Sequence, residues 1–434
     1  MSSQKLFSGR SSGKFSSHRT AEKKKSGKGR RILIGVLIAL VLLESLYCLL
    51  IFSNIPAIVN LRNNYIATAM STMSHSWLAT YFIPKDIIDD VMQGIADAQI
   101  KQDGIQSTWT KPTEPMLPES VPTQAPTTAP TVPTETTPVV NQDQQDFFAL
   151  FHELDQQSML DYVRENPQVT ADGWNHIRID EAGLQEEGLP VYTTAGDQVL
   201  AIDAENQILI LRVTGSGYRG VLSIAKDPTR LQLGVSQQLG GMGEHAGDIA
   251  QRYGGVLAMT GSGFLDEGGG GNGGELAGAC MSGGESYGEH YGWGYKRLEL
   301  REDNRMYIMD SYQYFSDDCT DAVEFRPAMI VDGEDIYDNM YTGTQPRACL
   351  GQNYQGEILM LVIEGRLASS AGTNVAECTE ILLRYDCAQA MNLDGGTSAI
   401  LWYDGRYITR CSNTVLDEGR YLPNAWVYGA VPEE

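Results

Sequence analysis

Hydrophobic and polar positions change their spacing several times along the chain, and each change predicts a different kind of structure. An apolar run at 32–52 has the length of a membrane-spanning helix. Apolar residues then recur at helical spacing in a membrane-proximal stalk at 53–107 and in a helical lead-in at 142–190. Residues 108–141 are rich in Pro and Thr, a composition that cannot build a core and predicts an extended linker. From 191 to 434, short apolar runs separated by turns predict a β-rich domain.

Two helices interrupt the strands of this domain. We expect one at 247–253 and one at 374–385, where Asn374 and Glu377 have the spacing of a capping box. Residues 215–220 match G-x-G-x-x-G, but a strand is expected directly after them, so we interpret the match as a hairpin rather than a dinucleotide-binding loop. Strands are expected at 199–202, 208–213, 221–225, 255–259, 297–312, 328–331, 358–363 and 399–403. The sequence therefore predicts an α+β fold, with a mixed or antiparallel β-rich domain and packed helices, preceded by one transmembrane helix and the Pro/Thr linker.

The charge of the chain is strongly uneven. The net charge is −23, yet residues 1–31 contain ten Lys or Arg against one acidic residue. A basic flank before an apolar span favours a cytoplasmic tail, which places the part after Phe52 outside the cell in a single-pass membrane topology. The acidic remainder lacks the basic footprint that nucleic acid requires, so we expect no nucleic-acid partner. The sequence leaves the oligomeric state open.

Cysteine and histidine spacing gives no metal-ligand pattern. Six of the seven cysteines lie outside the apolar span, which permits disulfides in an external compartment, but no C-x-x-C pair occurs. We expect no zinc site and no cofactor, and the sequence leaves a requirement for a divalent metal open. Three further acidic residues, Glu324, Asp332 and Asp335, are expected on solvated turns.

The strongest candidate for chemistry is the stretch 390–398, which joins an apolar run ending at Asn392 to a second apolar run. Asp394 follows the expected strand, and the two glycines after it leave backbone N–H groups open to a ligand. Thr397 and Ser398 add two hydroxyl groups. An ordinary Asp-Gly turn is the alternative for these residues taken alone.

Several separated motifs resemble, in the same order, those of the phosphodiester glycosidase family. The resemblance covers roughly 199–431, and Arg420 and Asn424 could reach the site in a family-like fold. The matching positions are Gly263 and Asn272 in the Gly-rich stretch 261–274, Pro346, Arg347, Ala348 and Gly351, Gly365 and Arg366, and Asn392, Leu393, Asp394, Gly395, Gly396 and Ser398.

The resemblance implies an enzyme that hydrolyses a sugar 1-phosphodiester and releases the sugar, here in an envelope or exopolysaccharide glycan. Glycosidic cleavage commonly uses two carboxylates. Asp394 is the first candidate for one of them, and Glu275 or Asp266 on the Gly-rich stretch for the other. Arg347 and Arg366 are candidates for holding the phosphate, because a guanidinium fork matches its oxygens. The other candidates for substrate binding are Asn392, Gly395, Gly396, Thr397, Ser398, Gly263 and Asn272.

Two other functions fit parts of the sequence. A non-catalytic glycan-binding or envelope-scaffold module would share the fold, the tether and the acidic surface. A membrane-tethered glycopolymer transferase would need a lipid-phosphate groove and a basic cluster, which the sequence does not suggest. The deciding feature is whether Asp394, Arg347 and Arg366 meet in one pocket with a second carboxylate.

Overall fold

The computed structural model describes residues 27–72, 75–110, 142–184, 188–266, 270–337 and 342–430, so most of the expected linker lies outside the described residues. The chain divides into two compact units, 1–62 and 63–434. The helices are α1 (Gly27–Phe52), α2 (Pro56–Met70), α3 (Trp77–Thr80), α4 (Lys85–Ile100), α5 (Gln142–Leu150), α6 (Gln156–Glu165), α7 (Glu181–Leu184), α8 (Ala246–Arg252) and α9 (Val375–Leu383), with 3-10 turns η1 (Pro167–Thr170), η2 (Trp174–His176), η3 (Pro228–Arg230) and η5 (Gly396–Ser398).

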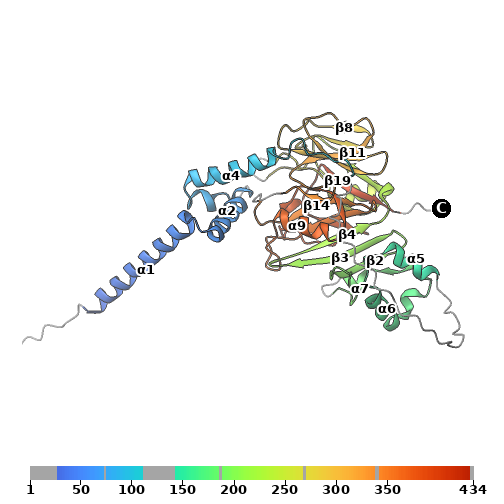
Figure 1. Cartoon of the computed structure of the whole chain (residues 1–434), viewed down its shortest axis with the longest axis horizontal. Helices are drawn as coiled ribbons and strands as arrows, with labels where there is room; N and C mark the ends of the chain where they lie inside the picture. The colour runs from blue at the N-terminus through green and yellow to red at the C-terminus, as the bar shows by residue number, and fades with distance from the viewer. Residues whose placement is uncertain are drawn as a thin grey trace, which may run out of the picture. The chain divides into compact units, whose positions relative to one another are not determined.

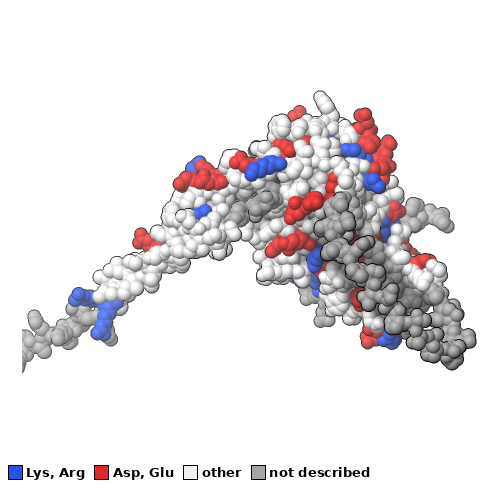
Figure 2. Space-filling model, viewed as in Figure 1, with Lys and Arg blue, Asp and Glu red and all other residues white. Residues whose placement is uncertain are grey.

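In the first unit, α1 contains the expected apolar span. Its residues Gly29–Phe52 are long and apolar enough to cross a membrane, and their 18-residue apolar window has no residue buried inside the protein. Figure 2 shows a largely uncharged surface along α1, with basic side chains at its N-terminal end. This helix is compatible with a single-pass membrane anchor or a signal sequence.

The second unit is built on three sheets in which every described strand pairing is antiparallel, one of the two arrangements that the sequence left open for its β-rich domain. The largest sheet has the order β1 (Arg178–Ile179), β2 (Gln198–Asp203), β3 (Ile208–Gly215), β4 (Tyr218–Ala225), β15 (Ile358–Ile363), β14 (Arg347–Asn353), β16 (Cys387–Asn392), β12 (Ala328–Val331) and β13 (Glu334–Asp335). The second sheet has the order β10 (Met306–Asp310), β9 (Lys296–Arg301), β11 (Cys319–Phe325), β7 (Cys280–Ser282) and β8 (Glu285–Tyr287). The third has the order β18 (Arg406–Tyr407), β17 (Leu401–Tyr403), β6 (Gly255–Thr260), β19 (Asn424–Gly429) and β5 (Leu231–Val235).

The central strands of the large sheet are apolar throughout because both of their faces are buried. In β15, Leu359, Leu361 and Ile363 belong to one core cluster, whereas Met360 and Val362 belong to another. Successive side chains of a strand point to opposite faces, so this alternation separates a core beneath α9 and the lead-in helices from a core shared with the other two sheets. Figure 1 shows α9 beside β14, and α5 to α7 near β2 and β3.

Residues 63–107 of the expected stalk belong to the second unit. The Gln102 amide donates to Ala328 O at 2.9 Å, and the ammonium of Lys296 donates to Ile105 O at 2.6 Å. Thr108 N donates to the Asp332 carboxylate at 2.9 Å. The end of the expected stalk and the start of the expected linker are therefore bound to the sheets, so the boundary at 107 does not separate the stalk from the β-rich domain.

Local patterns located most elements correctly. Asn374 caps α9 by accepting a hydrogen bond from Glu377 N, and the G-x-G-x-x-G match is a hairpin in which Gly215 pairs with Tyr218. The expectation that Glu324 lies on a solvated turn is wrong. Glu324 is a fully buried residue of β11, where backbone amides, an arginine and a histidine bind its carboxylate.

Candidate active site

A cavity of about 630 Å³ opens where several of the predicted motifs converge. It is lined by ten of the predicted site residues, namely Asp394, Asp266, Arg347, Arg366, Asn392, Gly395, Gly396, Thr397, Ser398 and Gly263. They come from β14, from the loop after β15, from the end of β16 and the turn after it, and from the Gly-rich stretch after β6. Two other predicted residues do not line this cavity. Asn272 donates to Gly241 O, 31 residues away, and accepts from Gly274 N in its own loop, and Glu275 is exposed.

The turn after β16 needs both of its glycines. A Cβ on Gly395 would lie 2.7 Å from Pro346 O, and Gly396 has φ +61°, which favours glycine. The expectation of two open amides at this turn is not met. Gly396 N–H donates to Pro346 O at 3.1 Å, and Gly395 N–H binds the Asp394 carboxylate. These amides hold the turn and the carboxylate in place rather than facing a ligand.

Asp394 lies directly after this strand in a desolvated part of the cavity. Burial raises its pKa to about 6, and the charge of Asp266 acts in the same direction. The Ser398 hydroxyl and the positive charge of Arg420 oppose the shift. A carboxyl group with a pKa near the operating pH can both accept and release a proton, which is the property required of a general base or acid.

Asp266 has the opposite environment. Its carboxylate is bound by both Nη atoms of Arg420, one of them at 3.0 Å, and by Gly271 N at 2.6 Å. The hydrogen bond from Arg420 is the main reason that the pKa of Asp266 is lowered. The Arg420 guanidinium also packs 4.6 Å from the centre of the Phe264 ring. The cavity therefore holds one ionised carboxylate and one that titrates near pH 6, a separation typical of acid–base sites.

The two predicted arginines supply positive charge that no carboxylate neutralises by an ion pair in the described part of the chain. Arg347 donates to Thr342 O at 2.7 Å, to Gly343 O at 2.8 Å and to Thr373 O at 3.2 Å. Burial lowers the pKa of Arg347 and that of Arg366, and the charge of Arg347 lowers the pKa of Arg366 further. Two adjacent guanidinium groups of this kind favour an anion between them.

Arg366 also has a strained backbone. Its φ is +57°, a left-handed conformation that costs a non-glycine residue about 1 kcal/mol or more. Among the described residues, its side chain has one hydrogen-bond partner, the side-chain amide of Gln345 at 3.4 Å. The conformation directs a guanidinium with a weak protein partner to the cavity, which suits a ligand-binding role.

Asn392 lines the cavity and has a buried, unsatisfied acceptor. Its amide nitrogen donates to Arg326 O at 2.8 Å, which fixes the side chain, while its Oδ1 is buried and has no hydrogen-bond partner. A buried acceptor without a partner costs about 1–3 kcal/mol. A ligand hydroxyl or N–H group would remove this cost.

Tyr291 is a cavity residue that the sequence did not indicate. Its ring stacks on Tyr295 with a centroid distance of 3.8 Å, and its N–H donates to the buried carboxylate of Glu324 at 2.7 Å. Burial raises the pKa of Tyr291, and the charge of Asp394 contributes to the rise. No local pattern could reveal this role because Glu324, which fixes the tyrosine, is more than thirty residues away.

One acidic cluster outside the cavity has the spacing of metal ligands. His152, Glu153 and Glu357 bring ligand atoms within 4.8 Å of one another. The ammonium of Lys226 donates to both carboxylates of this cluster, at 2.5 and 2.8 Å, so a cation already occupies it. We interpret the cluster as an ionic link between the lead-in and the large sheet.

The two carboxyl groups of separated pKa and the two guanidinium groups without an ion pair equip the cavity for acid–base chemistry on an anionic ligand. Residues 253–428 match the sequence model of the phosphodiester glycosidase family. This match agrees with the resemblance seen in the sequence and supports a glycosidase-like hydrolase.

Individual relatives are distant. The chain is 24% identical over 202 residues to the SPbeta prophage-derived uncharacterized protein YomE of Bacillus subtilis, a match that covers 44% of this chain and 30% of that protein. This chain thus spans less than a third of that relative's length. Among solved structures, the catalytic domain of zebrafish N-acetylglucosamine-1-phosphodiester alpha-N-acetylglucosaminidase, auto-inhibited by its pro-peptide, is 17% identical with a TM-score of 0.40, over 51% of this chain and 82% of that chain. A hypothetical protein from Synechocystis is 12% identical with a TM-score of 0.35, over 51% of this chain and 61% of that chain.

Proposed function

We propose that this protein is a membrane-anchored extracellular hydrolase that cleaves the glycosidic bond of a sugar 1-phosphodiester in an envelope or exopolysaccharide glycan. The observation that carries the proposal is the meeting of Asp394, a carboxyl group with a pKa of about 6, with Arg347 and Arg366 in one cavity. The family match at 253–428 supports the same reaction class.

In the proposed reaction, Asp394 is the general base. Its carboxylate takes a proton from water as the water oxygen bonds to the anomeric carbon, and the electron pair of the glycosidic C–O bond leaves with the phosphate. A phosphate is a good leaving group, so the step does not depend on a strong acid. The raised pKa makes Asp394 a better proton acceptor than Asp266, whose pKa is lowered.

The other cavity residues have supporting roles in this proposal. Arg366 binds the leaving phosphate, and Arg347 adds positive charge while it fixes the carbonyls of Thr342 and Gly343. The ionised carboxylate of Asp266 stabilises the positive charge of an oxocarbenium-like transition state. The free Oδ1 of Asn392 accepts a hydrogen bond from a hydroxyl or acetamido N–H group of the sugar.

The test is hydrolysis by the full chain in detergent micelles. The full chain is needed because Gln102, Ile105 and Thr108, which precede the linker, are hydrogen-bonded to the β-rich domain. Small N-acetylglucosamine-1-phosphodiester compounds and related sugar 1-phosphodiesters are the substrates, and free sugar is the product measured. Asp394→Asn should abolish release, whereas Asp172→Asn, an exposed aspartate outside the cavity, should not. No release from any of these compounds by the wild type, together with retained glycan binding, would favour the non-catalytic binding module.

A further inference from the structure

Three large, exposed aromatic side chains follow the cavity residue Tyr291 in the chain. Hydrogen bonds from buried side chains fix the segments that carry them. Trp293 is 67% exposed, Tyr314 is 92% exposed and Tyr312 is 39% exposed. The rings of Trp293 and Tyr312 stack on each other with a centroid distance of 4.2 Å and an angle of 27°. We call these three residues the aromatic platform. Its stacked pair keeps one aromatic surface turned to solvent, which is a costly arrangement for a side chain without a ligand.

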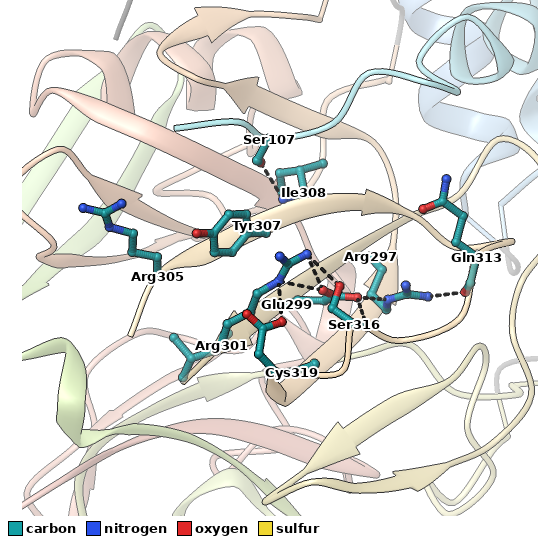
Figure 3. Close-up of polar contacts among 12 residues, drawn as sticks. Ser107, Arg297, Glu299, Arg301, Arg305, Tyr307, Ile308, Gln313, Ser316 and Cys319 are labelled. Carbon is teal, nitrogen blue, oxygen red and sulfur yellow. Dashed lines mark hydrogen bonds and ion pairs between the residues drawn. The ribbon is translucent and has the colours of Figure 1, made fainter. Parts of the chain in front are cut away.

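One buried arginine fixes the loop that carries Tyr312 and Tyr314. Arg297, which is fully buried, donates to Gln313 O at 2.8 Å and to Tyr314 O at 2.7 Å. Figure 3 shows Arg297 between Glu299 and Gln313, with Arg301 joining the same Glu299 carboxylate to Ser316. An exposed loop that is held by a buried ion network is preorganised for binding, so little conformational entropy is lost when a ligand docks.

The stacked pair of the platform lies near the cavity. Tyr291 lines the cavity, and Trp293 is only two residues further along, so their Cα atoms are at most about 7.6 Å apart. The Ser311 hydroxyl joins the two segments by donating to Gly292 O at 2.9 Å. The Tyr312 hydroxyl donates to the buried carboxylate of Asp310 at 3.0 Å, which fixes the orientation of its ring.

We propose that the aromatic platform binds a sugar ring of the same glycan, next to the unit whose phosphodiester is cleaved. The apolar C–H face of a pyranose packs on an aromatic ring, and Trp and Tyr combine a large rigid surface with polar edges that suit neighbouring hydroxyls. This inference rests on the proposed function of the cavity. It makes the natural substrate a polymer, or at least an oligosaccharide, rather than a single glycosyl phosphodiester.

A second copy of the chain fits the platform less well. Three aromatic side chains bury about 450–750 Å² even when they are fully covered. A stable protein interface usually buries about 800 Å² on each partner. The platform alone is too small for such an interface but large enough for one or two sugar rings.

The test compares polymer with small substrate. The full chain in detergent micelles is given a polysaccharide whose repeat units are joined by sugar 1-phosphodiester bonds and, separately, a small N-acetylglucosamine-1-phosphodiester. For Trp293→Ala, the ratio of kcat/KM for the polymer to kcat/KM for the small compound should fall about tenfold, mainly through KM. Trp293→Phe, which keeps a ring, should restore most of the ratio, and Tyr81→Ala, which removes an exposed ring of α3's C-terminal cap, should not change it. If the ratio of the two kcat/KM values is the same in Trp293→Ala as in the wild type, the platform does not bind the glycan.

Failure of the proposed function has a different outcome. If the wild type hydrolyses neither substrate, retention of the polymer in affinity electrophoresis still tests the platform. Weaker retention of Trp293→Ala than of wild type and Tyr81→Ala supports a glycan-binding platform. Equal retention of all three proteins rejects it.

Discussion

Asp394 and Asp266 line the same cavity, yet their surroundings move their pKa values in opposite directions. Desolvation raises the pKa of Asp394 to about 6, whereas the Arg420 guanidinium lowers that of Asp266. The two residues are 128 positions apart in the chain and carry the same functional group. Their different protonation behaviour is therefore a product of the fold, and it leads to the first two predictions.

The rate of hydrolysis should depend on pH through Asp394. A general base acts only when it is ionised, so kcat/KM should fall about tenfold per pH unit below about pH 6. The measurement is free sugar release by the wild type between pH 4 and 8. If kcat/KM instead begins to fall only below pH 4, Asp266 would be the base, because its pKa is lowered.

Asp394 should also reduce the stability of the folded protein at neutral pH. Its folded pKa lies above the ordinary value of 3.8, so the folded state binds more protons between these values and stability falls as pH rises through about 4 to 6. Asp394→Asn removes the buried charge and should raise the free energy of unfolding by about 1–3 kcal/mol at pH 7.5, after allowance for partial exposure. Unfolding midpoints in one detergent at pH 7.5 and pH 4 measure the effect. A variant less stable than wild type at pH 7.5 would contradict the assignment.

Arg420 should lower the pKa of both carboxyl groups, Asp266 and Asp394. Arg420→Gln leaves the largely buried Asp266 carboxylate without its ion pair, and breaking such a pair costs about 3 kcal/mol or more. Arg420 also lowers the pKa of Asp394, so its loss should move the acidic limb of kcat/KM to higher pH. Arg420→Lys should keep the limb closer to its wild-type position. A limb that stays fixed in Arg420→Gln would show that the arginine does not act on Asp394.

Arg366 should bind the anionic part of the substrate. Arg366→Ala should raise KM for a sugar 1-phosphodiester about ten- to a hundredfold, because a charge-assisted contact to phosphate is lost. Inorganic phosphate should raise the melting temperature of the wild type and have less effect on the variant. Arg164→Ala, which removes an exposed arginine of α6, is the matched control. Equal KM values for Arg366→Ala and wild type would exclude this role.

Sequence patterns predicted the parts of the fold that depend on neighbouring residues. The apolar run of β15 and the Asn374 cap of α9 appear as expected. Asp404-Gly405 forms the hairpin between β17 and β18. In that hairpin both central residues have positive φ, which explains why Asp-Gly is favoured there. Turn chemistry, capping and strand alternation are local rules, so a single sequence is enough to apply them.

The features that the sequence did not show depend on residues far apart in the chain. Asp266 and Arg420 are 154 positions apart, and each becomes informative only when the other is in place. Gln102 reaches Ala328 across 226 positions, which explains why a helical pattern alone suggested a free stalk. The Gly-Gly pair after Asp394 predicted a sharp turn correctly, but not that Pro346 would occupy the Gly396 amide.

The most direct test of the central claim is kcat/KM for a small N-acetylglucosamine-1-phosphodiester at pH 7.5, measured on the full chain as wild type, Asp394→Asn and Asp172→Asn. We predict release of free sugar by the wild type and by Asp172→Asn, and a fall of about 10²–10⁴ in Asp394→Asn. A rate in Asp394→Asn equal to that of the wild type would contradict the assignment of Asp394 as the general base.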